Sequence, residues 1–335
     1  MNKLLIKNAT IINENKRSLK DIYIEGEYIK EINTHIDLDD EVETINAKGL
    51  LVIPGMIDDQ VHFREPGLTH KGDISSESMA AVAGGVTSYI EMPNTFPNTT
   101  SINEFNKKIE TASTKSFANF SFMFGGTNDN ISEIKKINKS EVAGVKLFLG
   151  SSTGKMLIDN LSAIENIFNS TKLPISAHCE DEQTIRDNTN YYKNIYGEDI
   201  PVELHPKIRS DKACLKSSEF AVKLAKKTGA KLNVFHISTA KELKLFDNKI
   251  DIKNKKITAE VCAHHLWFTD DDYKKLGSKI KWNPAIKSQT DKDELWKALK
   301  EDKIDIIASD HAPHTEEEKN NKYLNCPSGG PMVQH

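Results

Sequence analysis

Cysteine is scarce in this sequence, and no two cysteines lie close together. The 335 residues include Cys179, Cys214, Cys262 and Cys326, and none of them belongs to a CxxC motif. The CxxC spacing is typical of thiolate zinc sites and redox motifs. Disulfide frameworks occur mainly in short, cysteine-rich secreted chains. We therefore expect four reduced thiols that pack as small buried hydrophobic residues in a reducing compartment.

The N-terminal segment lacks a long apolar run. Residues 1–15 alternate leucine and isoleucine with lysine and polar residues, and no apolar stretch follows. A signal peptide needs an apolar core of roughly 7–15 residues, and a membrane-spanning helix needs about 20. The pattern excludes both at this position and predicts a cytoplasmic protein.

A large excess of charge is also missing. The formal net charge is −4, and lysine-rich stretches such as residues 253–256 have acidic neighbours, as solvated faces do. We therefore expect no binding to nucleic acid or to a membrane surface. With 38% hydrophobic and 28% charged residues, the chain can bury one barrel-sized core or two smaller ones.

The order of predicted strands and helices indicates two domains. Residues 1–50 are turn-rich and predict a small β module, with strands at 4–8, 10–13, 21–24, 28–32 and 44–45. From residue 51 to 335, eight apolar runs follow at 51–57, 87–92, 119–124, 142–149, 174–177, 232–235, 257–261 and 304–308. Helical segments at 75–83, 102–111, 161–168, 212–227 and 292–300 lie between them.

Alternating strands and helices predict a parallel sheet. Eight such units favour an α/β fold of the (β/α)8 TIM-like barrel type over an open doubly wound sheet. The first apolar run is not followed by a GxGxxG motif, and no acidic residue stands where a ribose would need it.

Polar side chains follow nearly every predicted barrel strand. In chain order they are Gln60, His62, Arg64, Asn94, Lys146, His178, His236, His264, His265, Asp310 and His314. A single histidine after a strand is more often a hydrogen-bonded structural residue than a ligand. Many of them converging at the carboxyl ends of one barrel would be costly without partners, and a divalent metal cluster removes that cost.

Several segments, in this order, resemble the dihydroorotases of the amidohydrolase superfamily. They are VHFREPG (61–67), MPNT (92–95), GVKLFL (144–149), SAHCE (176–180), FHIST (235–239), WNP (282–284) and SDHAPH (309–314). The similarity runs from about residue 51 to the end, and residues 1–50 resemble the β module that this family places beside its barrel.

The resemblance implies a binuclear metal centre, with zinc as the expected ion. His62 and Asp310 would bind one metal, His178 and His236 the other, and Lys146, carbamylated by CO2, would bridge the two. A lysine on a buried strand is costly as an ammonium group, so its lowered pKa would favour reaction with CO2. Two metals would activate one hydroxide and polarise the scissile carbonyl, with Asp310 as the general base.

The resemblance also implies the substrate. Arg64, Asn94 and His314 would hold the carboxylate of dihydroorotate, while Asn283 and the backbone near Gly329, Gly330 and Pro331 would contact the ring. The reaction would be the reversible closure of N-carbamoyl-L-aspartate to L-dihydroorotate, a step of pyrimidine synthesis. Dihydropyrimidinases act on rings without that carboxylate, and allantoinases do not usually carry an arginine at the position of Arg64. Both facts argue against these sister enzymes, which are kept as alternatives.

Two features depart from the family pattern. Gln60 stands where the family has the first histidine of a His-x-His motif, and an amide oxygen is a weaker ligand than imidazole. We expect one tightly held zinc-like ion and a second one held weakly. The sequence also stops at His335, where the family continues to a final helix and strands, which predicts a truncated chain.

The loss of one ligand leaves a second class of function open. Some dihydroorotase-like chains are noncatalytic partners of aspartate transcarbamoylase. Only Gln60 differs among the matched positions, which favours an enzyme over such a subunit. The expected assembly is a homodimer, and association with aspartate transcarbamoylase is the other partner that the resemblance raises.

Overall fold

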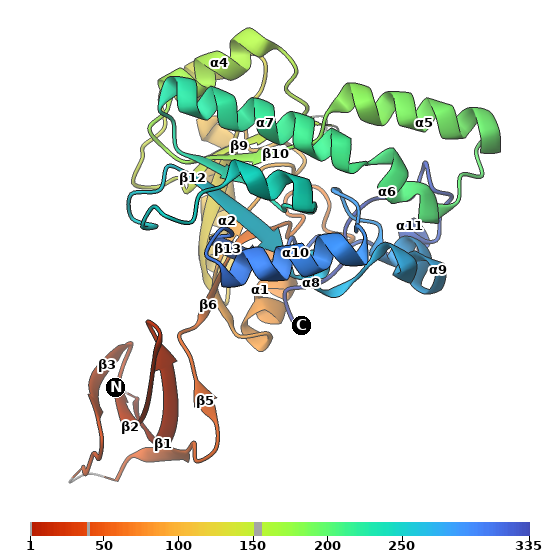
Figure 1. The fold of residues 1–335 in the computed structure, drawn as a ribbon. Helices are drawn as coiled ribbons and strands as arrows, with labels where there is room; N and C mark the ends of the chain where they lie inside the picture. Colours follow the sequence, from red (N-terminus) through yellow and green to blue (C-terminus); the bar gives the residue numbers. More distant parts are fainter. Residues whose placement is uncertain (1, 39–40, 151–155) are drawn as a thin grey trace. The chain divides into compact units, whose positions relative to one another are not determined.

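The computed structural model describes residues 2–38, 41–150 and 156–335. The chain divides into two compact units, residues 1–56 and residues 57–335. The first unit is all β, and the second contains parallel strands with helices between them (Figure 1).

The N-terminal unit is a five-stranded sheet built around its first strand. Its strands are β1 (Lys3–Asn13), β2 (Lys16–Glu25), β3 (Tyr28–Asn33), β4 (Glu43–Asn46) and β5 (Leu51–Val52). β1 pairs antiparallel with β2 and parallel with β4 and β5. The two predicted strands at 4–8 and 10–13 are one strand with a bulge, where Asn8 has a φ of 59°.

The second unit contains eight parallel strands in sequential order. They are β6 (Met56–Val61), β7 (Val86–Glu91), β8 (Asn119–Gly125), β9 (Gly144–Phe148), β10 (Ile175–His178), β11 (Leu232–Val234), β12 (Ile257–Cys262) and β13 (Ile306–Ala308). A parallel bridge between Val61 and His311 brings the first and last strands together. The predicted (β/α)8 barrel is therefore confirmed.

The first predicted barrel strand, residues 51–57, differs from the structure. Leu51 and Val52 belong to β5 and pair with β1, so they extend the N-terminal sheet. The first barrel strand is β6, which begins at Met56 and includes Gln60. Periodicity did not separate the two strands, because only Ile53, Pro54 and Gly55 lie between them.

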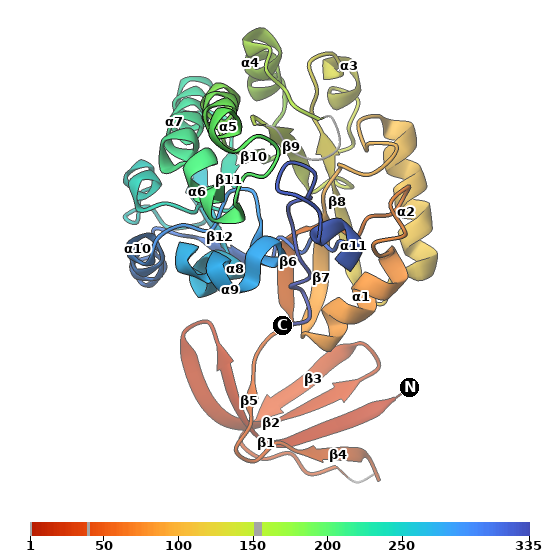
Figure 2. The same cartoon turned by 90° about the vertical axis from the view of Figure 1, so that its right-hand side faces the viewer.

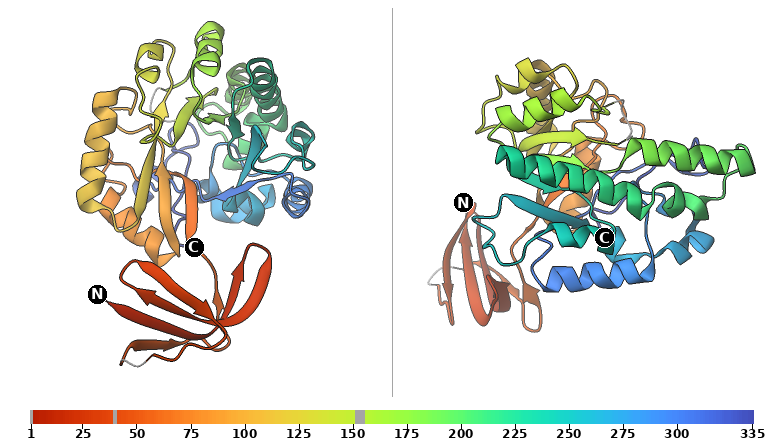
Figure 3. Two further views of the ribbon diagram at one scale, coloured as in Figure 1. Left: turned by 90° about the vertical axis from the view of Figure 1, so that its left-hand side faces the viewer. Right: turned by 45° about the horizontal axis from the view of Figure 1, so that its top comes forward.

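Helices surround the barrel strands (Figures 2 and 3). The α-helices are α1 (Ile74–Ala83), α2 (Ile102–Lys115), α3 (Ile131–Ile134), α4 (Leu161–Ser170), α5 (Glu182–Tyr196), α6 (His205–Ile208), α7 (Asp211–Thr228), α8 (Ala263–Trp267), α9 (Tyr273–Leu276), α10 (Gln289–Lys300) and α11 (Glu316–Lys319). The short 3-10 helices are Val202–Leu204, Ala240–Leu245, Asp270–Asp272 and Gly277–Ile280. Among the described residues, no helix has both the length and the apolar character needed to cross a membrane.

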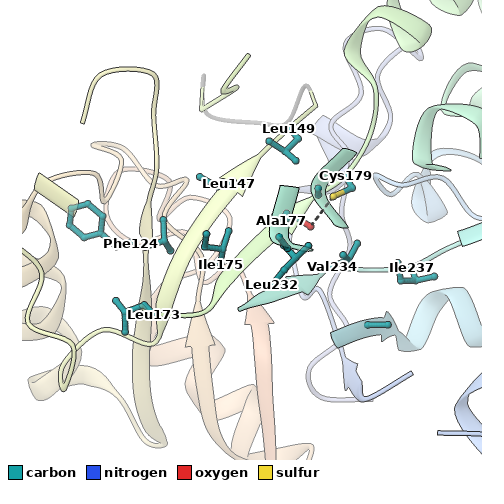
Figure 4. Packing of buried hydrophobic residues seen from close by; sticks show 14 of the residues in the cluster. Phe124, Leu147, Leu149, Leu173, Ile175, Ala177, Cys179, Leu232, Val234 and Ile237 are labelled. Atoms are coloured by element: carbon teal, nitrogen blue, oxygen red, sulfur yellow. Dashed lines mark hydrogen bonds between the residues drawn. The ribbon is translucent and has the colours of Figure 1, made fainter. Parts of the chain in front are cut away.

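The main hydrophobic core lies between the barrel strands and the helices. Figure 4 shows part of it, including Leu147, Ile175, Ala177, Leu232 and Val234. On β9, Val145 and Leu147 belong to this core, and Lys146 lies between them on the strand. Successive side chains of a strand point to opposite faces, so Lys146 points into the barrel.

Candidate active site

Most of the predicted functional residues line one cavity at the carboxyl ends of the barrel strands. Its lining consists of Gln60, His62, Arg64, Asn94, Phe148, His178, His236, Trp282, Asn283, Asp310, Ala312, Ser328 and Gly329. It encloses about 440 Å³ of free space, part of it open to solvent. The βα loops at this end of a barrel are where such enzymes carry their active sites.

Asp310 connects the first and last barrel strands across this cavity. Its Oδ1 lies 3.2 Å from His62 Nε2 and accepts a hydrogen bond of 3.1 Å from Gln60 Nε2. Gln60 and His62 are two residues apart, so they lie on the same face of an extended chain. The backbone of Asp310 has a φ of 46°, a left-handed conformation that is strained for most residues but tolerated by Asp and Asn.

The hydrogen bonds of His62 leave one ring nitrogen facing a carboxylate. Its Nδ1 lies 2.8 Å from Asn94 Oδ1, an acceptor, so Nδ1 carries the hydrogen in this amide orientation. Burial lowers the pKa of His62, with Asp310 opposing that shift, so the ring is expected to be neutral near pH 7. The lone pair of Nε2 then faces Asp310 Oδ1, an arrangement that a cation would stabilise.

A second pair of ring nitrogens converges on the other side of the cavity. His178 Nδ1 lies 2.9 Å from His236 Nε2, and burial lowers the pKa of both rings. Glu180 Oε2 lies 3.0 Å from His178 Nε2, and Arg209 pairs with the same carboxylate. A carboxylate behind a histidine is the usual way in which proteins orient a metal-binding ring.

Lys146 is buried between these two groups without a hydrogen-bond partner. Its side chain is 1% exposed, and Nζ lies 3.7 Å from the ring centroid of Phe235 and 5.0 Å from that of Phe148. Burial lowers the pKa of Lys146 to about 8, with Glu260 and Asp310 opposing the shift. Among the described residues, this is a fully buried amine with no polar contact to offset its desolvation.

Arg64 brings a positive charge to the cavity from the loop after β6. Its Nε donates to the Pro313 carbonyl at 3.0 Å, and Nη2 lies 3.0 Å from His314 Nε2. Burial lowers the pKa of Arg64 to about 10, which still leaves the guanidinium charged near pH 7. The remaining N–H groups of the planar fork are available to a ligand.

His314 lies behind Arg64 and is absent from the lining of this cavity. Lys71 Nζ lies 3.2 Å from its Nδ1, and its Nε2 lies 3.0 Å from the Ser328 carbonyl. Burial, together with the charges of Arg64 and Lys71, lowers the pKa of His314 to about 3. Its predicted role as a donor to the substrate stays a prediction, and its contacts are those of a residue that positions Arg64.

The last predicted residues lie at the rim near the end of the chain. Ser328 Oγ donates to Asn283 Oδ1 at 2.9 Å, and both residues line the cavity. Gly329 lines it as well, whereas Gly330 and Pro331 line a neighbouring cavity. Gly329 has a φ of 129°, and a Cβ there would lie 2.6 Å from the Ala312 carbonyl oxygen, so a larger residue would distort this wall.

Several residues of the site received no role from the sequence. Phe148, Phe235 and Trp282 surround the buried polar groups, and Glu180 supports His178. Glu180 could have been found, because it stands two residues after His178 and therefore on the same side of an extended segment. The aromatic residues gave no comparable signal.

The chemistry of these groups fits a divalent metal centre. Imidazoles and a carboxylate line one polar cavity, and Lys146, which is buried and absent from that lining, has no hydrogen-bond partner among the described residues. Gln60 is the exception, since its amide nitrogen faces Asp310 while its Oε1 lies 3.8 Å from Cys262 Sγ. In this orientation Gln60 offers no lone pair to an ion beside His62 and Asp310.

Comparison with known proteins is consistent with this chemistry. The family model described as "Dihydro-orotase-like" matches residues 49–242. A dihydroorotase from Methanosarcina mazei is 32% identical, covering 98% of this chain and 73% of that protein, and one from Staphylococcus epidermidis is 34% identical, covering 97% and 76%. The solved L-hydantoinase (dihydropyrimidinase) from Arthrobacter aurescens is 25% identical with a TM-score of 0.92, covering 100% of this chain and 75% of that one.

A second family model matches the C-terminal part of the chain. It is described as "Staphylococcal/Streptococcal toxin, OB-fold domain" and covers residues 242–331. An OB-fold is a five-stranded Greek-key barrel of β-strands. These residues instead contain β12 and β13, which pair in parallel, together with α8 and α10, so this part of the chain belongs to the (β/α)8 barrel.

Proposed function

The chain belongs to the dihydroorotase family of metal-dependent cyclic amidohydrolases. From this premise, we propose how its side chains bind L-dihydroorotate and hydrolyse it reversibly to N-carbamoyl-L-aspartate. The observation that carries the assignment of substrate is the buried guanidinium of Arg64 in the wall of a polar cavity. A planar fork suits bidentate binding of a carboxylate. Asn94 and Asn283 supply further polar groups to the ring and its carboxylate.

The metal ligands are the second part of the proposal. His62 and Asp310 would hold one ion, His178 and His236 would hold the other, and Lys146 as a carbamate would supply the centre with further anionic oxygen ligands. The lowered pKa of Lys146 supports this, because the neutral amine is the form that attacks CO2, losing a proton as the carbamate anion forms. When bound, the metal would activate water and polarise the amide carbonyl of the ring.

Asp310 moves the proton in this scheme. It accepts a proton from the attacking water and returns it to the ring nitrogen as the amide bond breaks. Gln60 donates a hydrogen bond to its Oδ1, and Asn94 fixes the ring of His62, which lies beside it. The reverse reaction uses the same carboxylate with the opposite direction of transfer.

Two other functions remain to be tested against this one. A hydantoinase or dihydropyrimidinase would hydrolyse rings without a carboxylate, and a noncatalytic subunit would turn over nothing while associating with aspartate transcarbamoylase. Assays of L-dihydroorotate, dihydrouracil and hydantoin with metal-loaded protein separate the three. Turnover of L-dihydroorotate, without turnover of dihydrouracil or hydantoin, supports our proposal. The oligomeric state is a separate question, and sedimentation of the same protein tests the proposed homodimer.

Replacing Arg64 by lysine is expected to lower kcat/KM for L-dihydroorotate by roughly tenfold or more. Lysine keeps the charge but loses the fork, and hydrogen bonds to charged groups contribute about 1.5–3 kcal/mol. The larger change should be in KM. Dihydrouracil, which has no carboxylate, serves as the control ligand and should be bound equally by both proteins. Wild-type kcat/KM in both Arg64→Lys and Arg64→Met would refute this role.

Replacing Gln60 by histidine is expected to raise the metal content of the proposed centre. The unmodified protein should hold about one tightly bound ion there, because the site beside His62 and Asp310 lacks an imidazole. Equilibrium dialysis and elemental analysis measure the number of metal ions per chain. A Lys146→Met variant should lose the ions of this centre, so the difference in metal content between a protein with and without Lys146→Met gives the number of ions that the centre holds. Gln60→His should bring that difference close to two.

The matched control is Gln183→His, which introduces a histidine at an exposed position of α5. It should leave the metal content unchanged. Two ions of equal affinity in the unmodified protein, with no gain in Gln60→His, would mean that the first site is already complete without an imidazole at position 60.

A further inference from the structure

Three side chains that can bind metal lie together at the carboxyl end of β12. Cys262 is the last residue of the strand and stands immediately before α8, which contains His264 and His265. One ligand atom from each of the three lies within 4.8 Å of the others. Cys262 and His264 are 0% exposed and His265 is 3% exposed, so the cluster is sealed from solvent.

Three of the four ring nitrogens of this cluster make no well-formed hydrogen bond to any residue that the structure describes. They are both nitrogens of His264 and Nδ1 of His265, although the backbone of Ser309 approaches His264 and opposes the fall in its pKa that burial causes. The Nε2 of His265 lies 3.1 Å from the Pro284 carbonyl, so Nε2 carries the hydrogen and Nδ1 keeps its lone pair. His264 stacks on Trp282 with ring centroids 4.5 Å apart and 10° between the planes, which fixes the orientation of its ring.

The thiol of Cys262 faces more acceptors than it can satisfy. Its Sγ lies 3.8 Å from both Gln60 Oε1 and Glu260 Oε1, and an S–H group has a single hydrogen to donate. Two ligands of a tetrahedral zinc ion, one sulfur and one oxygen, are about 3.6 Å apart, given the usual Zn–S and Zn–O bond lengths. The amide oxygen of Gln60 is therefore close to the place of a fourth ligand.

We propose that Cys262, His264 and His265 form a second metal site, for a borderline-soft ion such as Zn²⁺, with Gln60 Oε1 completing the coordination. One thiolate and two imidazoles favour zinc-like ions over Mg²⁺ or Ca²⁺, which prefer oxygen ligands. An ion would supply a partner to one ring nitrogen of His264 and to Nδ1 of His265, both of them buried. The hydrogen bond from His265 to a backbone carbonyl is the usual support for a metal-binding histidine.

This site is separate from the proposed hydrolytic centre, which uses none of the three residues. The sequence does not predict it, because Cys262 belongs to no CxxC motif and the resemblance gives His264 and His265 no role. The amide of Gln60 lies between the two centres, with Nε2 toward Asp310 and Oε1 toward Cys262. A histidine at position 60 would lack this amide oxygen.

Cobalt substitution tests the site, because Co²⁺ bound to a thiolate gives a sulfur-to-metal charge-transfer band in the near ultraviolet. The protein, stripped of metal and loaded with Co²⁺, is expected to show this band, and Cys262→Ser is expected to lose it together with one ion per chain. The matched control is Cys214→Ser, since Cys214 is equally buried and lies beside Ser238 rather than histidine. It should keep the band.

The Lys146→Met variant distinguishes this proposal from the proposed function. It is expected to lose the ions of the hydrolytic centre while keeping the charge-transfer band, so the band tests Cys262 whether or not L-dihydroorotate is hydrolysed. His265→Asn should weaken the band without removing the thiol. A folded cobalt-loaded protein without the band, or a Cys262→Ser variant that retains it and the full metal content, would overturn the proposal.

Discussion

The Asp310→Asn variant is expected to hydrolyse L-dihydroorotate at least about 10²–10⁴-fold more slowly than the unmodified protein. The substitution removes the proposed proton acceptor and, with it, the negative charge next to His62. Asparagine has nearly the same shape, and it tolerates the left-handed backbone of residue 310, whose φ is 46°. The fold should therefore persist, and steady-state assays with thermal unfolding as a check measure the effect.

Asp302 offers a matched control for this variant. It also has a left-handed backbone, with a φ of 57°, but it is exposed in the turn before β13. Asp302→Asn should leave both turnover and metal content unchanged. In Asp310→Asn, the ion that we propose for His178 and His236 should remain bound. Near-normal hydrolysis by Asp310→Asn would show that the general base is another residue.

The barrel was predictable because its signal is local and repeated. Each buried strand gives a short apolar run, and the polar residues that follow it are adjacent in sequence. Lys146 illustrates this, since its apolar neighbours Val145 and Leu147 lie in the core and the alternation of the strand turns the amine inward. The order of these runs therefore predicted which side chains meet at one end of the barrel.

Contacts between distant segments were not predictable in the same way. Gln60 and Cys262 are separated by 202 positions, and the direction of the Gln60 amide depends on which neighbours donate and accept hydrogen bonds. Helix α5 was missed for a different reason. Of its 15 residues only Ile185 is buried, and Tyr191, Ile195 and Tyr196 are exposed, so its apolar residues do not mark a contribution to the core.

The Lys108→Met variant is expected to lose about 3–5 kcal/mol of unfolding free energy, the usual cost of leaving a buried charge without its partner. Lys108 on α2 is 2% exposed, and its Nζ lies 2.6 Å from Glu91 Oε2 at the end of β7, where Glu91 is 0% exposed. Lys108 Nζ also donates to the Met92 carbonyl at 3.1 Å, next to the segment that carries Asn94. Denaturant unfolding at constant pH measures the loss.

The pH dependence of this loss identifies its cause. Burial raises the pKa of Glu91, and the charge of Lys108 opposes that shift, so removing Lys108 should raise the pKa further. A carboxyl group with a raised pKa in the folded state takes up a proton on folding, so its full contribution is present below the unfolded pKa and is lost as the pH rises through the folded pKa. The deficit of Lys108→Met should accordingly be smaller in acid than at neutral pH.

A second substitution and a neighbouring lysine complete the test of the ion pair. Lys108→Met combined with Glu91→Gln should recover most of the lost stability, because a neutral amide is far less costly to bury than an unpaired carboxylate. Lys107 on the same helix pairs with Glu104 at 2.8 Å, but its side chain is 62% exposed. Lys107→Met should therefore change stability by at most about 1 kcal/mol. An equally small, pH-independent effect in Lys108→Met would mean that water or another cation compensates Glu91.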